Sequence, residues 1–176
     1  MGNDLNILKA SLSTMLNQFG KDSVEQLRAE HLAAGQKASG RTLSEFAYDL
    51  TESETSLKLE IKGADHIEFL DRGRGPGGIP ANITDIIKQW ARDKGIASQF
   101  DKEYKLNSFA YLVARKIAAE GTWQHRTGRT YNGATRPVMA AFNEARIKAL
   151  QDEIDSALSI TINSEVLKEF KNGNNN

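Results

Sequence analysis

Residues 46–61, FAYDLTESETSLKLEI, contain the clearest period-two pattern of the chain. Apolar side chains occupy every second position in two runs, 46–50 and 57–61. Alternation of this kind is typical of strands that bury one face. The polar residues 51–56 separate the two runs, so the pattern predicts two strands joined as a β-hairpin with a long tip.

Two further short strands are predicted from the same kind of alternation. One covers residues 66–70, where Ile67 and Phe69 share a face after a turn at Gly63. The other covers residues 158–162, where Leu158, Ile160 and Ile162 alternate with polar residues. The sheet is therefore expected to be small.

Helices are predicted wherever apolar residues recur three and four positions apart. They cover residues 5–19, 23–34, 82–94, 108–120 and 137–157, with a short last helix through 166–170. Glycines are placed to end four of them, at positions 20, 35, 95 and 121, because glycine adopts the left-handed conformation that commonly closes a helix. Residues 35–44 and 121–136 are expected to be loops, and the polar end 171–176 is expected to be disordered.

These elements predict an α+β fold, with a small antiparallel β-sheet packed against several α-helices and helical extensions at both termini. The expected organisation is an N-terminal helical extension over residues 1–38, an α+β core over 39–162, and a short helix with a polar tail over 163–176. The first helix lies either on its own domain or, as an arm, on a neighbouring subunit.

The composition favours one soluble globular domain and excludes several classes of chemistry. The chain has 176 residues, 23 basic and 23 acidic side chains, and no cysteine. Disulfides, thiolate zinc sites, iron–sulfur clusters and cysteine nucleophiles are therefore excluded. No apolar run reaches the ~18 residues that a membrane span needs, and residues 1–4 are not expected to begin a secretory signal. Zero net charge argues against general avidity for nucleic acid.

Residues 72–80, RGRGPGGIP, are too rich in glycine and proline for regular structure. Their glycines match G-x-G-x-x-G, the spacing of a dinucleotide-binding turn. However, Pro76 lacks the N–H that a phosphate cradle would use, and Pro80 delays the next helix to Asn82. We therefore expect a rigid turn or an inter-subunit contact, formed by Arg72, Gly73, Arg74, Gly75, Pro76 and Gly77.

No catalytic or metal-binding constellation is evident. The three histidines, at positions 31, 66 and 125, are far apart, and the H-x-E at 66–68 lacks the two cysteines of a zinc deaminase. Asp65, Glu68 and Asp71 are closely spaced, but on a strand they would alternate between faces and be solvated. We therefore expect no catalytic residue, no cofactor, no metal and no enzymatic activity.

One segment, residues 115–136, has a local excess of basic charge with aromatic residues interleaved. Its members are Arg115, Lys116, Arg126, Arg129 and Arg136, against Glu120 alone, with Trp123 and Tyr131 between them. Guanidinium groups bind phosphate oxygens without reading base sequence. The segment would therefore bind phosphates, pair with acidic residues of a neighbour, or remain solvated.

Several short segments, in this order, resemble the neck or tail-completion proteins of tailed bacteriophages. The strand-then-glycine segment HIEFLDRGRGPG, residues 66–77, is similar to theirs. Pro80, Ile83, Trp90 and Lys94-Gly95 resemble the family pattern P-x-x-I…W…K-G. YLVARKIAAEGT, residues 111–122, resembles the next helix, and PVMAAFNEA, residues 137–145, resembles the proline-led final helix. The resemblance covers about residues 39–160; the N-terminal helices, and the two helices within 82–121, distinguish this chain from shorter members.

The resemblance implies a structural virion protein that forms a ring of six or twelve copies in the phage neck, around the genome channel. It would be made in the host cytoplasm, contact portal, adaptor or tail proteins of the same virion, and let double-stranded DNA pass transiently. Arg126, Arg129 and Arg136, with Trp123 and Tyr131, would then line the channel or an interface. The alternative is a nucleic-acid-binding module that uses the basic segment 115–136.

Overall fold

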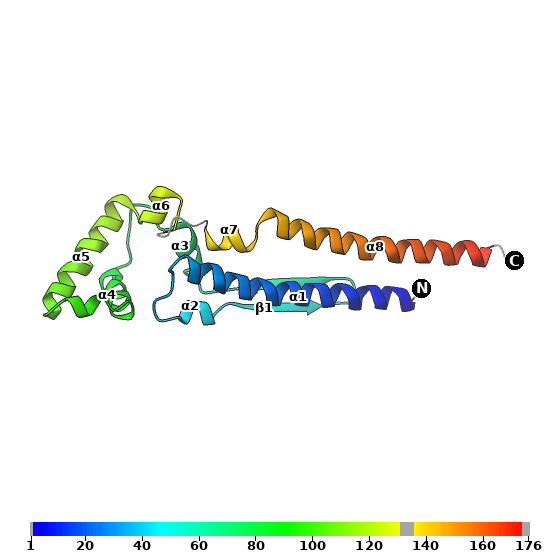
Figure 1. Cartoon of the computed structure of the whole chain (residues 1–176), viewed down its shortest axis with the longest axis horizontal. Coiled ribbons are helices and arrows are strands. Elements are labelled where there is room, and N and C mark those ends of the chain that lie inside the picture. Colours follow the sequence, from blue (N-terminus) through cyan, green and yellow to red (C-terminus); the bar gives the residue numbers. More distant parts are fainter. Residues whose placement is uncertain (1, 131–135, 174–176) are drawn as a thin grey trace. The chain divides into compact units, whose positions relative to one another are not determined.

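The computed structural model describes residues 2–130 and 136–173 and has the expected α+β class, with helices and one two-stranded antiparallel sheet (Figure 1). The chain divides into two compact units. The hairpin unit comprises Met1–Gln26, Ala47–Lys62 and Phe142–Asn176, and the helical unit comprises Leu27–Phe46 and Gly63–Ala141. This division joins segments that are distant in the sequence, whereas the predicted extension, core and tail followed the chain order.

The predicted β-hairpin is confirmed in the hairpin unit. Strand β1 (Ala47–Glu52) pairs with β2 (Leu57–Lys62) in a register that places Tyr48 opposite Ile61 and Leu50 opposite Leu59. The pairing extends to Glu52 and Leu57, so the tip is shorter than residues 51–56. In an antiparallel pair, side chains directly opposite each other share one face, so these apolar residues form one face of the sheet.

Helix α1 (Gly2–Ala33) is continuous, so the predicted break at Gly20 is wrong, and the two helices predicted over 5–19 and 23–34 are one. Gly20 lies where the hairpin packs: a Cβ atom there would be 2.6 Å from Cδ2 of Tyr48. The Ser23 hydroxyl is buried within the helix and accepts a 3.0 Å hydrogen bond from Arg146. The helix ends as predicted, at a glycine with positive φ, Gly35.

This contact reverses the usual sign of a glycine-to-alanine change. In most helix interiors Gly→Ala stabilises by about 0.5–1 kcal/mol. Here we expect Gly20→Ala to lower the free energy of unfolding, because the new methyl group would displace the Tyr48 ring, whose hydroxyl donates to Asn17 at 2.9 Å. Thermal unfolding followed by far-UV circular dichroism measures this. A higher melting temperature than that of the unmodified chain would contradict the packing.

The C-terminal region is one helix, α8 (Glu144–Gly173), which begins after a break from α7 (Pro137–Ala141). The predicted strand at 158–162, the separate helix at 166–170 and the continuous helix over 137–157 are therefore wrong. Asn143 causes the break by accepting the Arg146 N–H at 3.0 Å, as an N-cap does. The helix continues to Gly173, into the segment expected to be disordered; residues 174–176 lie outside the described residues.

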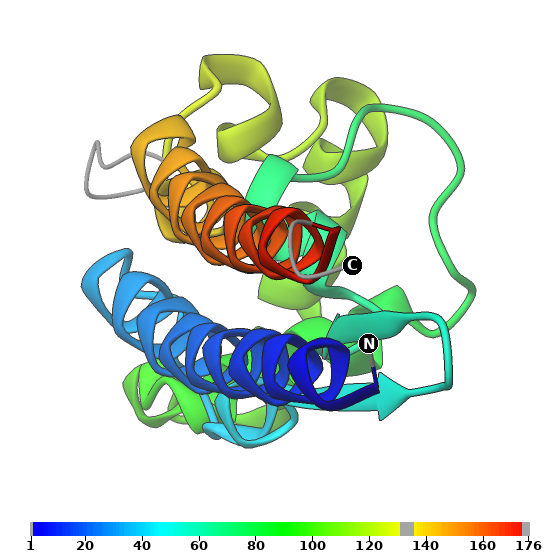
Figure 2. The same ribbon diagram turned by 90° about the vertical axis from the view of Figure 1, so that its right-hand side faces the viewer.

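Both α8 and the hairpin pack against the first part of α1. Figure 2 shows them on different sides of that helix. On the hairpin side, Lys9 donates to the Ser53 carbonyl at 2.6 Å and Ser13 donates to Glu52. On the α8 side, the Arg146 guanidinium lies 4.8 Å from the centroid of the Phe19 ring. Helix α1 is therefore the central element of the hairpin unit.

The helical unit contains α2 (Arg41–Ser44), α3 (Ile67–Arg72), α4 (Ile83–Asp93), a 3₁₀ turn (Ile96–Gln99), α5 (Glu103–Glu120), α6 (Trp123–Thr127) and α7. Its core lies between α4 and α5, where Ile87 meets Ala110 and Ala114. The two alanines allow the helix axes to approach closely. The helices predicted at 82–94 and 108–120 are confirmed, although α5 begins earlier, at Glu103.

Residues 66–70, predicted as a strand, form helix α3 instead. The Leu70 N–H donates to the His66 carbonyl at 3.2 Å, and the Gly73 N–H donates to Phe69 at 3.0 Å. The only sheet among the described residues is the hairpin, so this segment has no strand to pair with. A two-residue alternation is too short to exclude helix. Helices α2 and α6 likewise occupy segments expected to be loops.

Candidate functional site

The glycine-rich stretch after α3 runs along the C-terminal end of α5. Arg74 and Thr122 bond reciprocally: the Arg74 N–H donates to the Thr122 hydroxyl at 2.9 Å, and the Thr122 N–H donates to the Arg74 carbonyl at 2.8 Å. The Gly77 N–H donates to the Ala118 carbonyl at 2.9 Å. These two N–H groups, of Arg74 and Gly77, are used within the fold and do not point at a phosphate.

Two glycines permit this close approach. A Cβ atom on Gly73 would lie 2.4 Å from the backbone nitrogen of His125, and one on Gly121 would lie 2.7 Å from the Arg74 carbonyl oxygen. Both residues also have positive φ, of 75° and 77°. Of the residues expected to form the turn, Arg72 is the last residue of α3, whereas Gly73, Arg74, Gly75, Pro76 and Gly77 lie in the connection to α4.

The structure separates the residues of the basic segment. Trp123 and Arg126 lie on α6, and Arg126 forms an ion pair with Glu120, which offsets its charge. Arg129 is exposed and Arg136 is half-buried. Tyr131 lies outside the described residues. Arg115 and Lys116 are exposed on α5.

The histidines and the clustered carboxylates have separate structural roles. His66 bonds to the Thr42 hydroxyl at 2.9 Å, and His125 is exposed. Asp71, expected to be solvated on a strand, is instead buried, and its carboxylate accepts the Val138 N–H at 2.8 Å. Over residues 2–130 and 136–173, no group of three or more metal-ligating side chains comes together.

Of the ionisable side chains described in the helical unit, His31 is the least exposed, at 1%. Its Nδ1 lies 2.6 Å from the side-chain oxygen of Gln36, whose amide in turn donates to the Leu70 carbonyl at 2.6 Å. Its ring packs on Phe46 with the centroids 5.2 Å apart, and Nε2 is buried without a hydrogen-bond partner. Burial lowers the pKa of His31 below its ordinary value of 6.5, although Gln36 and Asp71 oppose this shift.

The hairpin unit has almost no apolar core of its own. Among its described residues, Val24 is the only buried apolar side chain, whereas the described part of the helical unit buries eleven, Pro137 included. Large apolar side chains are exposed near the N-terminus of α1 and near the C-terminus of α8, which lie at the same end of the helix pair (Figure 1). They are Leu5 and Ile7 on α1, and Ile160, Ile162, Val166, Leu167 and Phe170 on α8.

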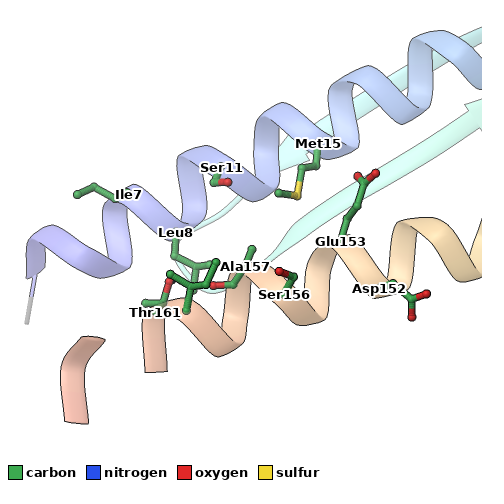
Figure 3. Close-up of a pocket in the computed structure, with 10 residues that line it drawn as sticks. Ile7, Leu8, Ser11, Met15, Asp152, Glu153, Ser156, Ala157 and Thr161 are labelled. Atoms are coloured by element: carbon green, nitrogen blue, oxygen red, sulfur yellow. The ribbon is translucent and has the colours of Figure 1, made fainter. Parts of the chain in front are cut away.

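A groove lies between α1 and α8, within the hairpin unit (Figure 3). Its volume is about 550 Å³, and its walls are mainly apolar. Leu8 and Met15 project into it from α1, and Ala157 lies opposite them on α8 (Figure 3). The remaining lining residues are Ile7, Ser11, Asp152, Glu153, Ser156, Ile160 and Thr161. The groove can take an apolar side chain or helix face, and it holds no constellation for covalent chemistry.

Five large apolar side chains are exposed on the distal part of α8 and are here called the distal stripe: Ile160, Ile162, Val166, Leu167 and Phe170. The distal stripe was not predicted, because the alternation of residues 158–162 is typical of a strand. The available signal was the spacing of Ile162, Val166 and Phe170, four residues apart, which is typical of one helix face.

Among the described residues, no helix has the length and apolar character that crossing a membrane requires. No family model, curated protein or solved structure matches this chain.

Proposed function

We propose that this protein is a structural subunit of a tailed-phage virion, assembling into a ring in the neck that connects head and tail around the genome channel. The family part of this proposal rests on the resemblance of residues 39–160 to neck proteins. The proposed role is mechanical and requires no catalytic residue.

The observation that carries the proposal is the missing core of the hairpin unit. Among the described residues of this unit, Val24 is the only buried apolar side chain, and five large apolar side chains on α8 are 46–69% exposed. Exposed apolar surface of this extent is typical of protein–protein interfaces. Such a unit is expected to gain much of its stability from contacts with other copies.

The test is the mass of the full chain by light scattering, alone and after mixing with the portal complex of the same virion. Rings give a mass of about 116 or 233 kDa, six or twelve times the 19.4 kDa of one chain. Negative-stain electron microscopy of the same sample would show rings with a central channel. A monomer in both samples would contradict the proposal.

The nucleic-acid alternative makes a separate prediction about the basic segment. A binding module that used Arg126 and Arg129 would lose affinity for double-stranded DNA in the Arg126→Ala, Arg129→Ala double variant, and its affinity would fall steeply with salt. We expect DNA binding to be weak at physiological salt and unchanged by this double substitution, since Arg126 is already paired with Glu120. Fluorescence anisotropy with a labelled duplex measures this; a loss of tenfold or more would favour the alternative.

A further inference from the structure

The two units carry opposite net charges, although the whole chain is neutral. The hairpin unit contains 8 basic and 13 acidic residues, and the helical unit contains 15 basic and 10 acidic residues. Their formal net charges are therefore −5 and +5. Surfaces of opposite sign attract each other, whereas like charges brought together repel. This distribution favours contacts in which the helical unit of one copy meets the hairpin unit of another.

The helical unit presents an exposed aromatic and basic surface on α5, here called the α5 face: Tyr104, Ser108, Tyr111, Leu112 and Arg115. Residues three or four apart share one side of a helix. Tyr104, Tyr111 and Leu112 are 58–61% exposed. Arg115 is exposed and has no ion-pair partner in the described part of the chain, whereas both carboxylates of α5 already pair with arginines of the same unit. Tyrosine and arginine are enriched where proteins bind each other, so the α5 face has the composition of a docking surface.

The hairpin unit carries an acidic and apolar surface on α8, here called the α8 face: Asp155, Ser159, Ile162 and Val166. Ile162 follows Glu153, which lines the groove, by nine residues, so at 100° per residue this face lies opposite the groove (Figure 3). Ile162 and Val166 are 59% and 46% exposed. Asp155 is exposed and, among the residues that the structure describes, has no cation paired with it.

The two faces have the same spacing, because residues 104, 108, 111 and 115 and residues 155, 159, 162 and 166 are both separated by four, three and four positions. Two antiparallel helices would pair Arg115 with Asp155, Tyr111 with Ser159, Ser108 with Ile162, and Tyr104 with Val166. Each pair then joins opposite charges, a large and a small side chain, or two apolar groups. Large side chains opposite small ones let helices interdigitate. The parallel direction would place Arg115 against Val166 and leave Asp155 without a cation.

We infer that the α5 face of one copy packs antiparallel on the α8 face of the next copy. The inference rests on the proposed function and deepens it, since it names the contact by which the ring is built. A subunit with one face of each kind binds two neighbours head to tail, and such contacts form a ring when the rotation closes. DNA is a less suitable occupant of the α5 face, because Arg115 is its single cation and tight DNA binding uses several phosphate contacts.

A charge swap tests this contact. Arg115→Glu and Asp155→Arg each bring like charges together, so we expect either variant to fall to the 19.4 kDa of one chain where the unmodified chain has a six- or twelve-fold mass. The double variant restores opposite charges and should regain that mass. Lys37→Glu and Glu54→Arg make the same charge changes at exposed positions of the same two units, outside both faces, and should assemble normally. Light scattering measures the mass, and far-UV circular dichroism checks that the helices are retained.

The outcomes separate the contact from the proposed function. Normal assembly of either single variant would overturn the inference and leave the ring intact. Dissociation of both single variants without recovery in the double variant would also overturn it, because the two residues would then act at different contacts. A loss of duplex DNA affinity of tenfold or more in Arg115→Glu, with assembly unchanged, would assign the α5 face to nucleic acid instead. An unmodified chain that stays monomeric with the portal complex would contradict the proposed function, and the inference with it.

Disulfide cross-linking gives a second test that changes no charge, since the chain has no cysteine of its own. Tyr111→Cys and Ser159→Cys lie opposite each other in the proposed contact. After oxidation with diamide, we expect the double variant to give species at multiples of 19.4 kDa and each single variant to remain uncross-linked. Cross-linking of a single variant would mean that like faces pack together, and a disulfide within one chain would mean that both faces meet in the same copy. Either result, or no cross-link in an assembled ring, would overturn the inference.

Discussion

Gly121→Ala is expected to lower the free energy of unfolding of the helical unit by about 3–5 kcal/mol. Gly121 has φ 77° and ψ 178°, a conformation that is almost restricted to glycine and costs other residues about 1–3 kcal/mol. In addition, the new methyl carbon would lie 2.7 Å from the Arg74 carbonyl oxygen, which is backbone and cannot rotate away. Relief of this contact would break the paired hydrogen bonds between Arg74 and Thr122.

Gly95→Ala is the matched control for this experiment. Gly95 also has positive φ, of 73°, and also follows a helix, but no atom lies within 4 Å of a Cβ built there. Gly95→Ala should therefore lower the free energy of unfolding only by the cost of placing alanine at positive φ, about 1–2 kcal/mol. Urea unfolding followed by tryptophan fluorescence reports on this unit, because Trp90 and Trp123, the only two tryptophans of the chain, both lie in it. An equal decrease in the free energy of unfolding in the two variants would show that the glycine-rich stretch after α3 is not packed against α5.

Acid should weaken the helical unit through His31. Because burial depresses the pKa of this histidine in the folded state, the unfolded chain takes up a proton first as the pH falls below 6.5. The stabilisation that neutral His31 gives the folded state is therefore fully present above pH 6.5 and is lost as the pH falls below it. For one proton, the free energy of unfolding changes by at most about 1.4 kcal/mol per pH unit. A protonated ring would also leave the Nε2 donor without an acceptor.

His31→Gln isolates this effect because glutamine does not titrate. We expect the urea midpoint of this variant to change less between pH 7 and pH 5 than that of the unmodified chain. His125→Gln removes an exposed histidine and should leave the pH dependence unchanged. The groups near His31, namely Glu30 on its own helix and Asp71 on α3, are present in all three proteins, so their titration cancels in the comparison. Identical pH profiles for His31→Gln and the unmodified chain would contradict the assignment.

The hairpin and the helix ends were predictable because their signals are local. Alternation over 46–61 gave both strands and their shared face, since side chains along a strand point to alternate sides. Gly35, Gly95 and Gly121 ended helices as expected, since each has the positive φ that favours glycine. The groove and the stripe were not predicted, because the groove joins residues 7–15 to residues 152–161, and no local pattern relates such distant segments.

The class of fold, the hairpin, most helix ends and the absence of thiol chemistry follow from residue type and short-range spacing. The remaining features depend on contacts between segments that are distant in the sequence. Gly20 stays inside a helix because the hairpin packs against it, and residues 158–162 are helical because no strand in the described part of the chain pairs with them. Intrinsic preferences differ by less than about 1 kcal/mol per residue, so packing and hydrogen bonding outweigh them. Which apolar faces remain uncovered depends on that packing alone.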